Sequence, residues 1–169
     1  MNTRKYLLFS LSLILALVMV PTLQGSAKTV KTTFTGTDTL GRDIDPGKET
    51  FPDKNLYHVR NNVFTSLVEA SDPRVSGEAL YDFNCNFKLV DPPVYVIGRM
   101  WGTFKLSNAD GYWEGIIEGV RIKNGYSYFK YVGHGEGAYK GLQLRMRYER
   151  LDPDPSVPGT IRGYILETE

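Results

Sequence analysis

The sequence predicts an all-β protein, a closed antiparallel barrel of about eight strands that forms a single domain. Apolar and polar residues alternate with a period of two along most of the chain, as they do in strands with one buried face. Clusters of Gly, Pro, Asn and Asp interrupt these runs at regular intervals, which is typical of hairpin turns. No window of a dozen residues has the spacing of an amphipathic helix.

The first 27 residues predict a cleavable signal peptide. Arg4 and Lys5 precede an apolar run over residues 6–20, and small residues follow up to Ala27. An uncleaved transmembrane anchor is the alternative, although an apolar run of about 15 residues is shorter than the roughly 20 that a spanning helix needs. Cleavage after Ala27 would leave a domain over residues 28–169, secreted or periplasmic, without a stable membrane anchor.

The strand pattern is clearest near the C-terminus, where Leu144 and Met146 alternate with Arg145 and Arg147. Because one closed sheet has one interior, we predict that the leucine and methionine point inward and the two arginines point into solvent. The runs predicted as strands cover residues 29–38, 57–70, 77–89, 94–107, 111–122, 126–134, 139–150 and 159–168.

The residues between these runs predict how the strands are connected. The pairs Asp110-Gly111 and Asn124-Gly125 are favourable hairpin sequences. Residues 40–55 form the one long irregular segment, which we predict to be a surface loop at one end. Glycines also occur inside the runs, where they are expected at strong bends or close contacts, and this favours a barrel over a sandwich.

The glycine-rich stretch GHGEGAYKGL, residues 133–142, is a formal match to a dinucleotide-binding fingerprint. That site needs a helix directly afterwards, whose N-terminal N–H groups bind the pyrophosphate. The residues that follow alternate with the period of a strand instead. We therefore predict a bend in a strand and no nucleotide site.

Charge and cysteine content argue against several kinds of partner. Without Arg4 and Lys5, 18 basic residues face 19 acidic ones, so the mature chain has no basic excess for nucleic acid. Cys85 is the only cysteine and lies among apolar positions, which predicts a buried, unreactive thiol. Asp43 and Asp45 lack the later ligands of a calcium loop. We expect no metal and no cofactor.

Residues 100–149 resemble the allene oxide cyclase barrel-like group, which includes dirigent-like proteins and many uncharacterised secreted bacterial proteins. The resemblance rests on a W-G-x-[FW] strand, a D-G-x-W-E-G hairpin and a G-x-G-x-Y-x-G-L segment, and extends over roughly residues 71–167. It implies a barrel that binds an apolar molecule inside and, in some members, steers a cyclisation or a radical coupling. The catalytic carboxylate and tyrosine positions of the plant enzymes have no match here.

The predicted function is the binding of a small apolar or aromatic molecule in the barrel interior, without catalysis. A barrel of eight strands is either filled by side chains or holds one small ligand. The number of subunits is left open. The residues predicted to contact the ligand share the inward, apolar register: Tyr81, Phe83, Met100, Phe104, Leu144 and Met146.

Two other functions stay open, a cyclase or isomerase and a structural or envelope interaction protein. The weak catalytic candidates are Glu114, Glu118 and Tyr148. Inside the barrel, the two glutamates would be desolvated acids; outside, they would pair with Arg99 or Arg145. We expect the carboxylates outside. A carboxylate that points into an open cavity would favour the enzyme.

Overall fold

The computed structural model describes residues 28–90 and 95–168, so the predicted signal peptide lies outside the described residues. The all-β prediction is confirmed: this part of the chain contains nine strands and one short 3-10 turn, η1. The elements are β1 (Thr29–Asp45), β2 (Lys48–Asp53), β3 (Leu56–Ala70), η1 (Pro73–Val75), β4 (Gly77–Val90), β5 (Tyr95–Ser107), β6 (Gly111–Arg121), β7 (Ser127–Gly137), β8 (Gln143–Arg150) and β9 (Gly159–Thr168).

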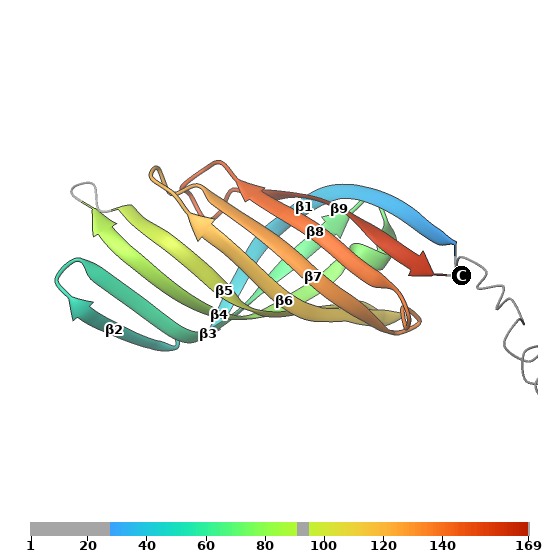
Figure 1. Cartoon of the computed structure of the whole chain (residues 1–169), viewed down its shortest axis with the longest axis horizontal. Helices are drawn as coiled ribbons and strands as arrows, with labels where there is room; N and C mark the ends of the chain where they lie inside the picture. Colours follow the sequence, from blue (N-terminus) through green and yellow to red (C-terminus); the bar gives the residue numbers. More distant parts are fainter. Residues whose placement is uncertain (1–27, 91–94, 169) are drawn as a thin grey trace, which may run out of the picture.

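The strands form one antiparallel sheet that closes into a ring (Figure 1). Neighbours along the chain pair from β3 through to β9, and β9 then pairs with residues 29–38 of β1. The second half of β1, residues 36–45, pairs with β3 and closes the ring. β2 pairs with β3 alone, so the hairpin β2–β3 projects beyond the ring at the end away from the C-terminus (Figure 1).

The prediction of a loop over residues 40–55 is wrong. β1 continues to Asp45, the chain turns at Gly47 with a φ of 73°, and β2 then runs back into the sheet. Both segments pair with the same neighbour, β3, which satisfies much of their backbone hydrogen bonding. Residues 40–45 and 48–53 are exposed on both faces, so their sequence lacks the alternation that reveals a strand.

The interior of the ring holds the hydrophobic core, and its register agrees with the predicted one. Leu144 is 0% exposed and Met146 is buried, whereas Arg145 is partly exposed and Arg147 is exposed. The prediction for these two faces of β8 is therefore confirmed. The core also contains Phe34, Val68, Ala79, Tyr81, Phe83, Phe104, Leu106, Trp113, Ile117, Tyr131, Ile161 and Ile165.

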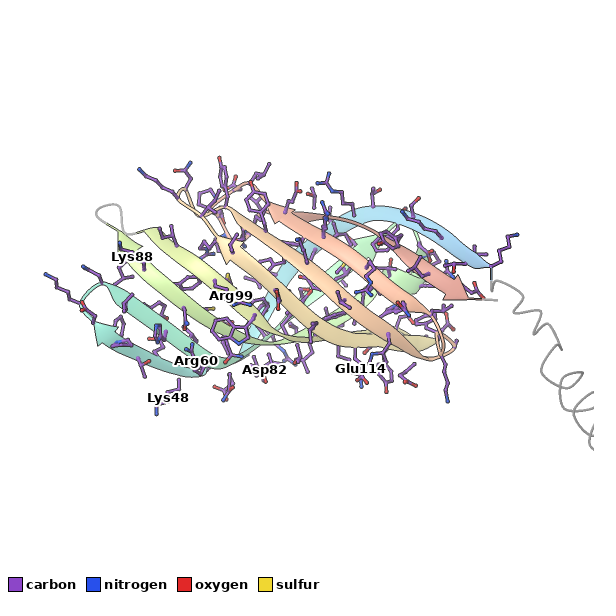
Figure 2. All side chains as sticks on the ribbon, viewed as in Figure 1. Lys48, Arg60, Asp82, Lys88, Arg99 and Glu114 are labelled. Carbon is purple, nitrogen blue, oxygen red and sulfur yellow. The ribbon has the colours of Figure 1, made fainter. Side chains whose placement is uncertain are left out.

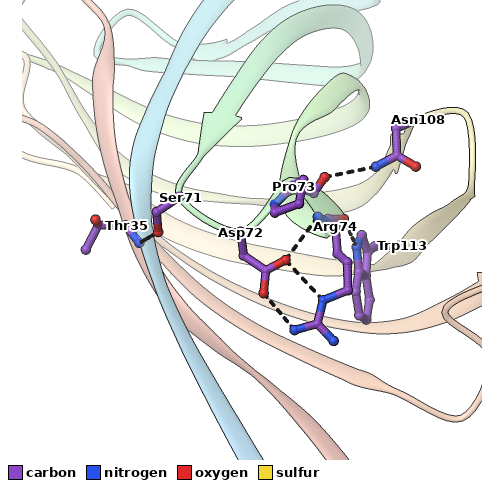
Figure 3. A network of polar contacts seen from close by, with 7 residues as sticks. All are labelled: Thr35, Ser71, Asp72, Pro73, Arg74, Asn108 and Trp113. Atoms are coloured by element: carbon purple, nitrogen blue, oxygen red, sulfur yellow. Dashed lines mark hydrogen bonds and ion pairs between the residues drawn. The ribbon is translucent and has the colours of Figure 1, made fainter.

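The 3-10 turn η1 fills one end of the ring. Its Val75 is completely buried in the core, and the Nε1 of Trp113 donates a hydrogen bond of 2.6 Å to the backbone oxygen of Arg74. Asp72 caps the turn and forms an ion pair of 2.7 Å with Arg74 (Figure 3). These contacts pack η1 against the core at this end of the ring.

The glycine-rich stretch 133–142 covers the end of β7 and the tight turn that follows it. β7 ends at Gly137, a turn follows, and β8 begins at Gln143. Gly137 and Gly141 have φ values of 69° and 89°, which glycine adopts more readily than other residues. Residues 133–137 thus form the end of β7, as the predicted strand requires, and residues 138–142 form the turn that leads into β8. A strand follows it in place of the helix that a dinucleotide site requires.

Candidate ligand-binding site

A cavity of about 220 Å³ lies inside the ring, at the end opposite η1, and is partly open to solvent. Its position follows from the strand ends: Arg121 is the last residue of β6, Ser127 the first of β7 and Arg150 the last of β8. The residues that line it are Asp38, Leu40, Asp43, Asn62, Phe64, Ser66, Tyr81, Phe83, Met100, Arg121, Ser127, Phe129, Tyr131, Tyr148, Arg150 and Pro155.

Aromatic rings form most of the apolar wall of this cavity. The rings of Phe83 and Phe129 meet edge to face, with centroids 5.4 Å apart, and Phe129 and Tyr148 are 5.6 Å apart. Phe64 and Tyr81 stack at 5.1 Å on the neighbouring strands β3 and β4. Contacts of this kind hold the rings in place, so the wall is preformed.

Half of the residues predicted to contact a ligand line the cavity. Tyr81, Phe83 and Met100 are among its lining residues, and so is Tyr148, one of the three weak catalytic candidates. The remaining three predicted residues, Phe104, Leu144 and Met146, are buried in the hydrophobic core and are not among those that line the cavity.

The glutamates considered as catalytic candidates lie on the outside of the ring. The side chain of Glu118 is 60% exposed and approaches Arg99 at 3.7 Å. The side chain of Glu114 is 43% exposed and lies 3.3 Å from the Nε2 of His134. Figure 2 shows Arg99 and Glu114 on the ribbon that carries them. The expected outer position of both glutamates is confirmed.

A different carboxylate lines the cavity, which corrects the expectation that the carboxylates lie outside. Asp38 of β1 is only 6% exposed, and its Oδ2 accepts a hydrogen bond of 2.9 Å from the hydroxyl of Tyr81. Burial raises the pKa of Asp38, while hydrogen bonds from Ser66 and Tyr81 and the positive charge of Arg150 act in the opposite direction. Burial also raises the pKa of Tyr81 well above its usual value.

Two arginines form the polar side of the cavity. In the sheet register Arg121 pairs with Ser127, and Ser127 pairs with Arg150, so the three residues form one row across β6, β7 and β8. Since neighbouring strands lie roughly 4.8 Å apart, the two arginine backbones are about 10 Å apart. The Nε atoms of both arginines are buried and have no hydrogen-bond partner among the described residues. Burial lowers the pKa of Arg121, and the charge of Arg150 lowers it further.

The sequence pattern could have predicted that these charged residues point inward. Arg150 continues the inward series of Leu144 and Met146, and Arg121 lies four residues after the buried Ile117. Asp38 likewise lies four residues after the buried Phe34. A charged residue at the end of an apolar strand face is therefore the pattern that would have predicted this cavity.

Neither a metal cluster nor a membrane helix accompanies the cavity in the described part of the chain. Within residues 28–90 and 95–168, no three His, Cys, Asp or Glu side chains come together in a way that could hold a metal ion. The same part of the chain contains no helix that is long and apolar enough to cross a membrane.

Comparison of the chain with protein-family models, with curated proteins and with solved structures finds no match. A relation to the allene oxide cyclase barrel-like group therefore stays a prediction from the glycine and aromatic motifs of residues 100–149. The candidate site rests on the geometry of the cavity.

Proposed function

We propose that this protein is an exported β-barrel that binds one small, mainly apolar or aromatic molecule in its interior. The observation that carries the proposal is the preformed cavity of about 220 Å³ with aromatic walls at one end of the ring. Concave, mainly apolar sites with a few polar groups are the usual form of small-molecule sites. The motif resemblance to the allene oxide cyclase barrel-like and dirigent-like group supports the same use of the interior.

The cavity limits how much of a ligand it can enclose. Its volume is about 220 Å³. It is smaller than the roughly 300–1,000 Å³ of pockets that enclose drug-sized molecules. A single aromatic ring with a short substituent fits this space.

Titration with cinnamyl alcohol, a neutral ring with a three-carbon substituent, tests the proposal by isothermal titration calorimetry. Saturable binding is expected, and Ser127→Phe should abolish it because the added ring fills the cavity from β7. Tyr128→Phe, one residue further along the same strand and outside the cavity lining, is the matched control. Absence of saturable binding would contradict the proposal and favour a structural or envelope interaction protein.

Export is tested separately, from the N-terminus of the protein recovered from its own cell. Cleavage of the signal peptide after Ala27 predicts a chain that begins at Lys28 and is found in the periplasm or the medium. A full-length chain in the membrane fraction would support the alternative of an uncleaved anchor.

Catalysis by a cyclase or isomerase is the second candidate, and the position of Asp38 favours it. A buried carboxyl with a raised pKa, hydrogen-bonded to Tyr81 and facing an open cavity, is suited to act as a general acid. The cavity walls would hold a reactive substrate near its attack geometry. Asp38→Asn separates the two candidates: a binder retains its affinity for ligands, whereas an enzyme retains affinity and loses turnover.

A further inference from the structure

Arg121 and Arg150 bring two positive charges to a cavity that Asp38 and Asp43 also line. Neither arginine forms an ion pair with a carboxylate of the described residues. Both have a buried Nε without a hydrogen-bond partner there, and Arg150 is only 8% exposed. A guanidinium has only donors to offer, so each of these two buried Nε–H groups lacks an acceptor among the described residues.

Two arginines on the outside of the ring have carboxylate partners. Arg162 donates a hydrogen bond of 2.6 Å to Glu149, and Arg99 lies 3.7 Å from Glu118. Arg150 is buried and Arg121 is partly buried, so both should need a partner more than these exposed arginines do, because an unpaired buried charge costs several kcal/mol. Asp38 is not the hydrogen-bond partner of either arginine, since it forms no ion pair with them. Its Oδ2 accepts a hydrogen bond from the hydroxyl of Tyr81 instead.

The two arginines and Ser127 are also arranged in a way that suits an anion. They lie side by side on β6, β7 and β8, so the two guanidinium groups can approach one ligand from both sides of the serine. Arginine is well suited to bind carboxylates because its planar group can donate two parallel hydrogen bonds. The aromatic wall of Phe83 and Phe129 lines the same cavity.

We propose that the ligand is a small aromatic or otherwise apolar carboxylic acid, bound with its carboxylate between Arg121 and Arg150 and its apolar part against the aromatic wall. This inference rests on the proposed function and adds the chemical class of the ligand. The cavity volume of about 220 Å³ restricts the enclosed part to a molecule of about one ring.

Three probes of the same shape test this inference: trans-cinnamate, cinnamyl alcohol and cinnamylamine, which are anionic, neutral and cationic. Each is titrated into the unmutated protein by calorimetry. Cinnamate should bind at least about tenfold more tightly than the alcohol, because hydrogen bonds between charged groups are the stronger ones. The amine should bind most weakly, because its charge repels the arginines.

Variants then assign the preference to the two arginines. Arg121→Gln and Arg150→Gln should each lower the affinity for cinnamate by about tenfold and leave the affinity for cinnamyl alcohol nearly unchanged. Arg147→Gln, an exposed arginine of the same strand as Arg150, should change neither affinity. Circular dichroism checks that each variant is folded. If a variant does not fold, the comparison of the three probes on the unmutated protein still tests the preference for the acid.

The possible outcomes separate this inference from the proposed function. Equal binding of the acid and the alcohol would overturn the inference and leave the proposed function standing. A preference for the acid that survives both Arg→Gln changes would overturn the role of Arg121 and Arg150. Failure of all three probes to bind would overturn both proposals.

Discussion

Arg121 and Arg150 lie on either side of Ser127 and place two positive charges at the same end of one cavity. The Nε of each is buried without a hydrogen-bond partner among the described residues. Buried unpaired charges destabilise a folded protein, so this arrangement lowers stability unless a ligand supplies the missing acceptor. Residues that lower the stability of the folded protein in this way are frequent at functional sites.

Arg150→Met should therefore stabilise the protein without ligand. Methionine fills similar space without the desolvation penalty, and replacement of buried charges by apolar side chains often gains about 1 kcal/mol or more. For a domain of this size, the melting temperature should rise by about 2–4 °C. Scanning calorimetry measures the change, with Arg147→Met on the outer face as control. A fall of several degrees would show that the Arg150 guanidinium is bonded within the protein.

Asp38→Asn should raise stability more at neutral pH than in acid. Burial in the folded state raises the pKa of Asp38 above 3.8, so the folded state holds its proton more tightly than the unfolded state does. Below pH 3.8 both states are protonated and the group has no effect; above it, the unfolded state ionises first and stability is lost as the pH rises. Asparagine does not ionise and still offers an acceptor to Tyr81.

The measurement is the free energy of unfolding of both proteins in urea from about pH 3.5 to pH 7, a range that begins near the ordinary pKa of an aspartate. The advantage of the variant should grow as the pH rises. An advantage that is constant with pH, or that shrinks, would mean that Asp38 titrates at or below its ordinary value in the folded protein.

Leu144→Asp should prevent folding, whereas Arg145→Gln should change stability by only about 0.5 kcal/mol. Leu144 is 0% exposed, so aspartate there would bury a charge without a partner. Arg145 is partly exposed on the opposite face of β8. Circular dichroism and urea unfolding compare the two variants, and a larger loss for Arg145→Gln would reverse the assignment of the two faces.

Cys85 should resist thiol reagents in the native protein. Its side chain is buried, at 6% exposure, and burial raises the pKa of the thiol to about 11. At about pH 8 Ellman's reagent should therefore react at the rate of unfolding, and urea should make the thiol fully reactive. Immediate stoichiometric reaction in buffer would show that the interior is more accessible than the packing around Cys85 allows.

The strands of the ring could be predicted from the sequence because each has one buried and one exposed face. The alternation of Leu144 and Met146 with Arg145 and Arg147 follows directly from that environment. β2 could not be predicted in this way, since both of its faces are exposed and no apolar period results. The pairing of β1 with β3 depends on contacts between distant segments, which local periodicity does not contain.

The cavity was only half predicted, for a related reason. Its aromatic residues Tyr81 and Phe83 follow the apolar period, which places them inside. Asp38, Arg121 and Arg150 obey the same period, but charged residues are by default expected in solvent. Charged side chains enter an interior only when they have a partner or a function, and the sequence pattern alone does not distinguish those cases.

A titration of the ¹⁵N-labelled protein with trans-cinnamate, followed by NMR, tests the central claim most directly. Binding in the cavity predicts saturable shifts of the amides of Ser127, Phe129, Tyr148 and Arg150, which line it from β7 and β8. Exposed positions such as Phe51 of β2 should not change. Shifts that gather on the outer face of the ring, or that do not saturate, would contradict the claim that the interior cavity is the binding site.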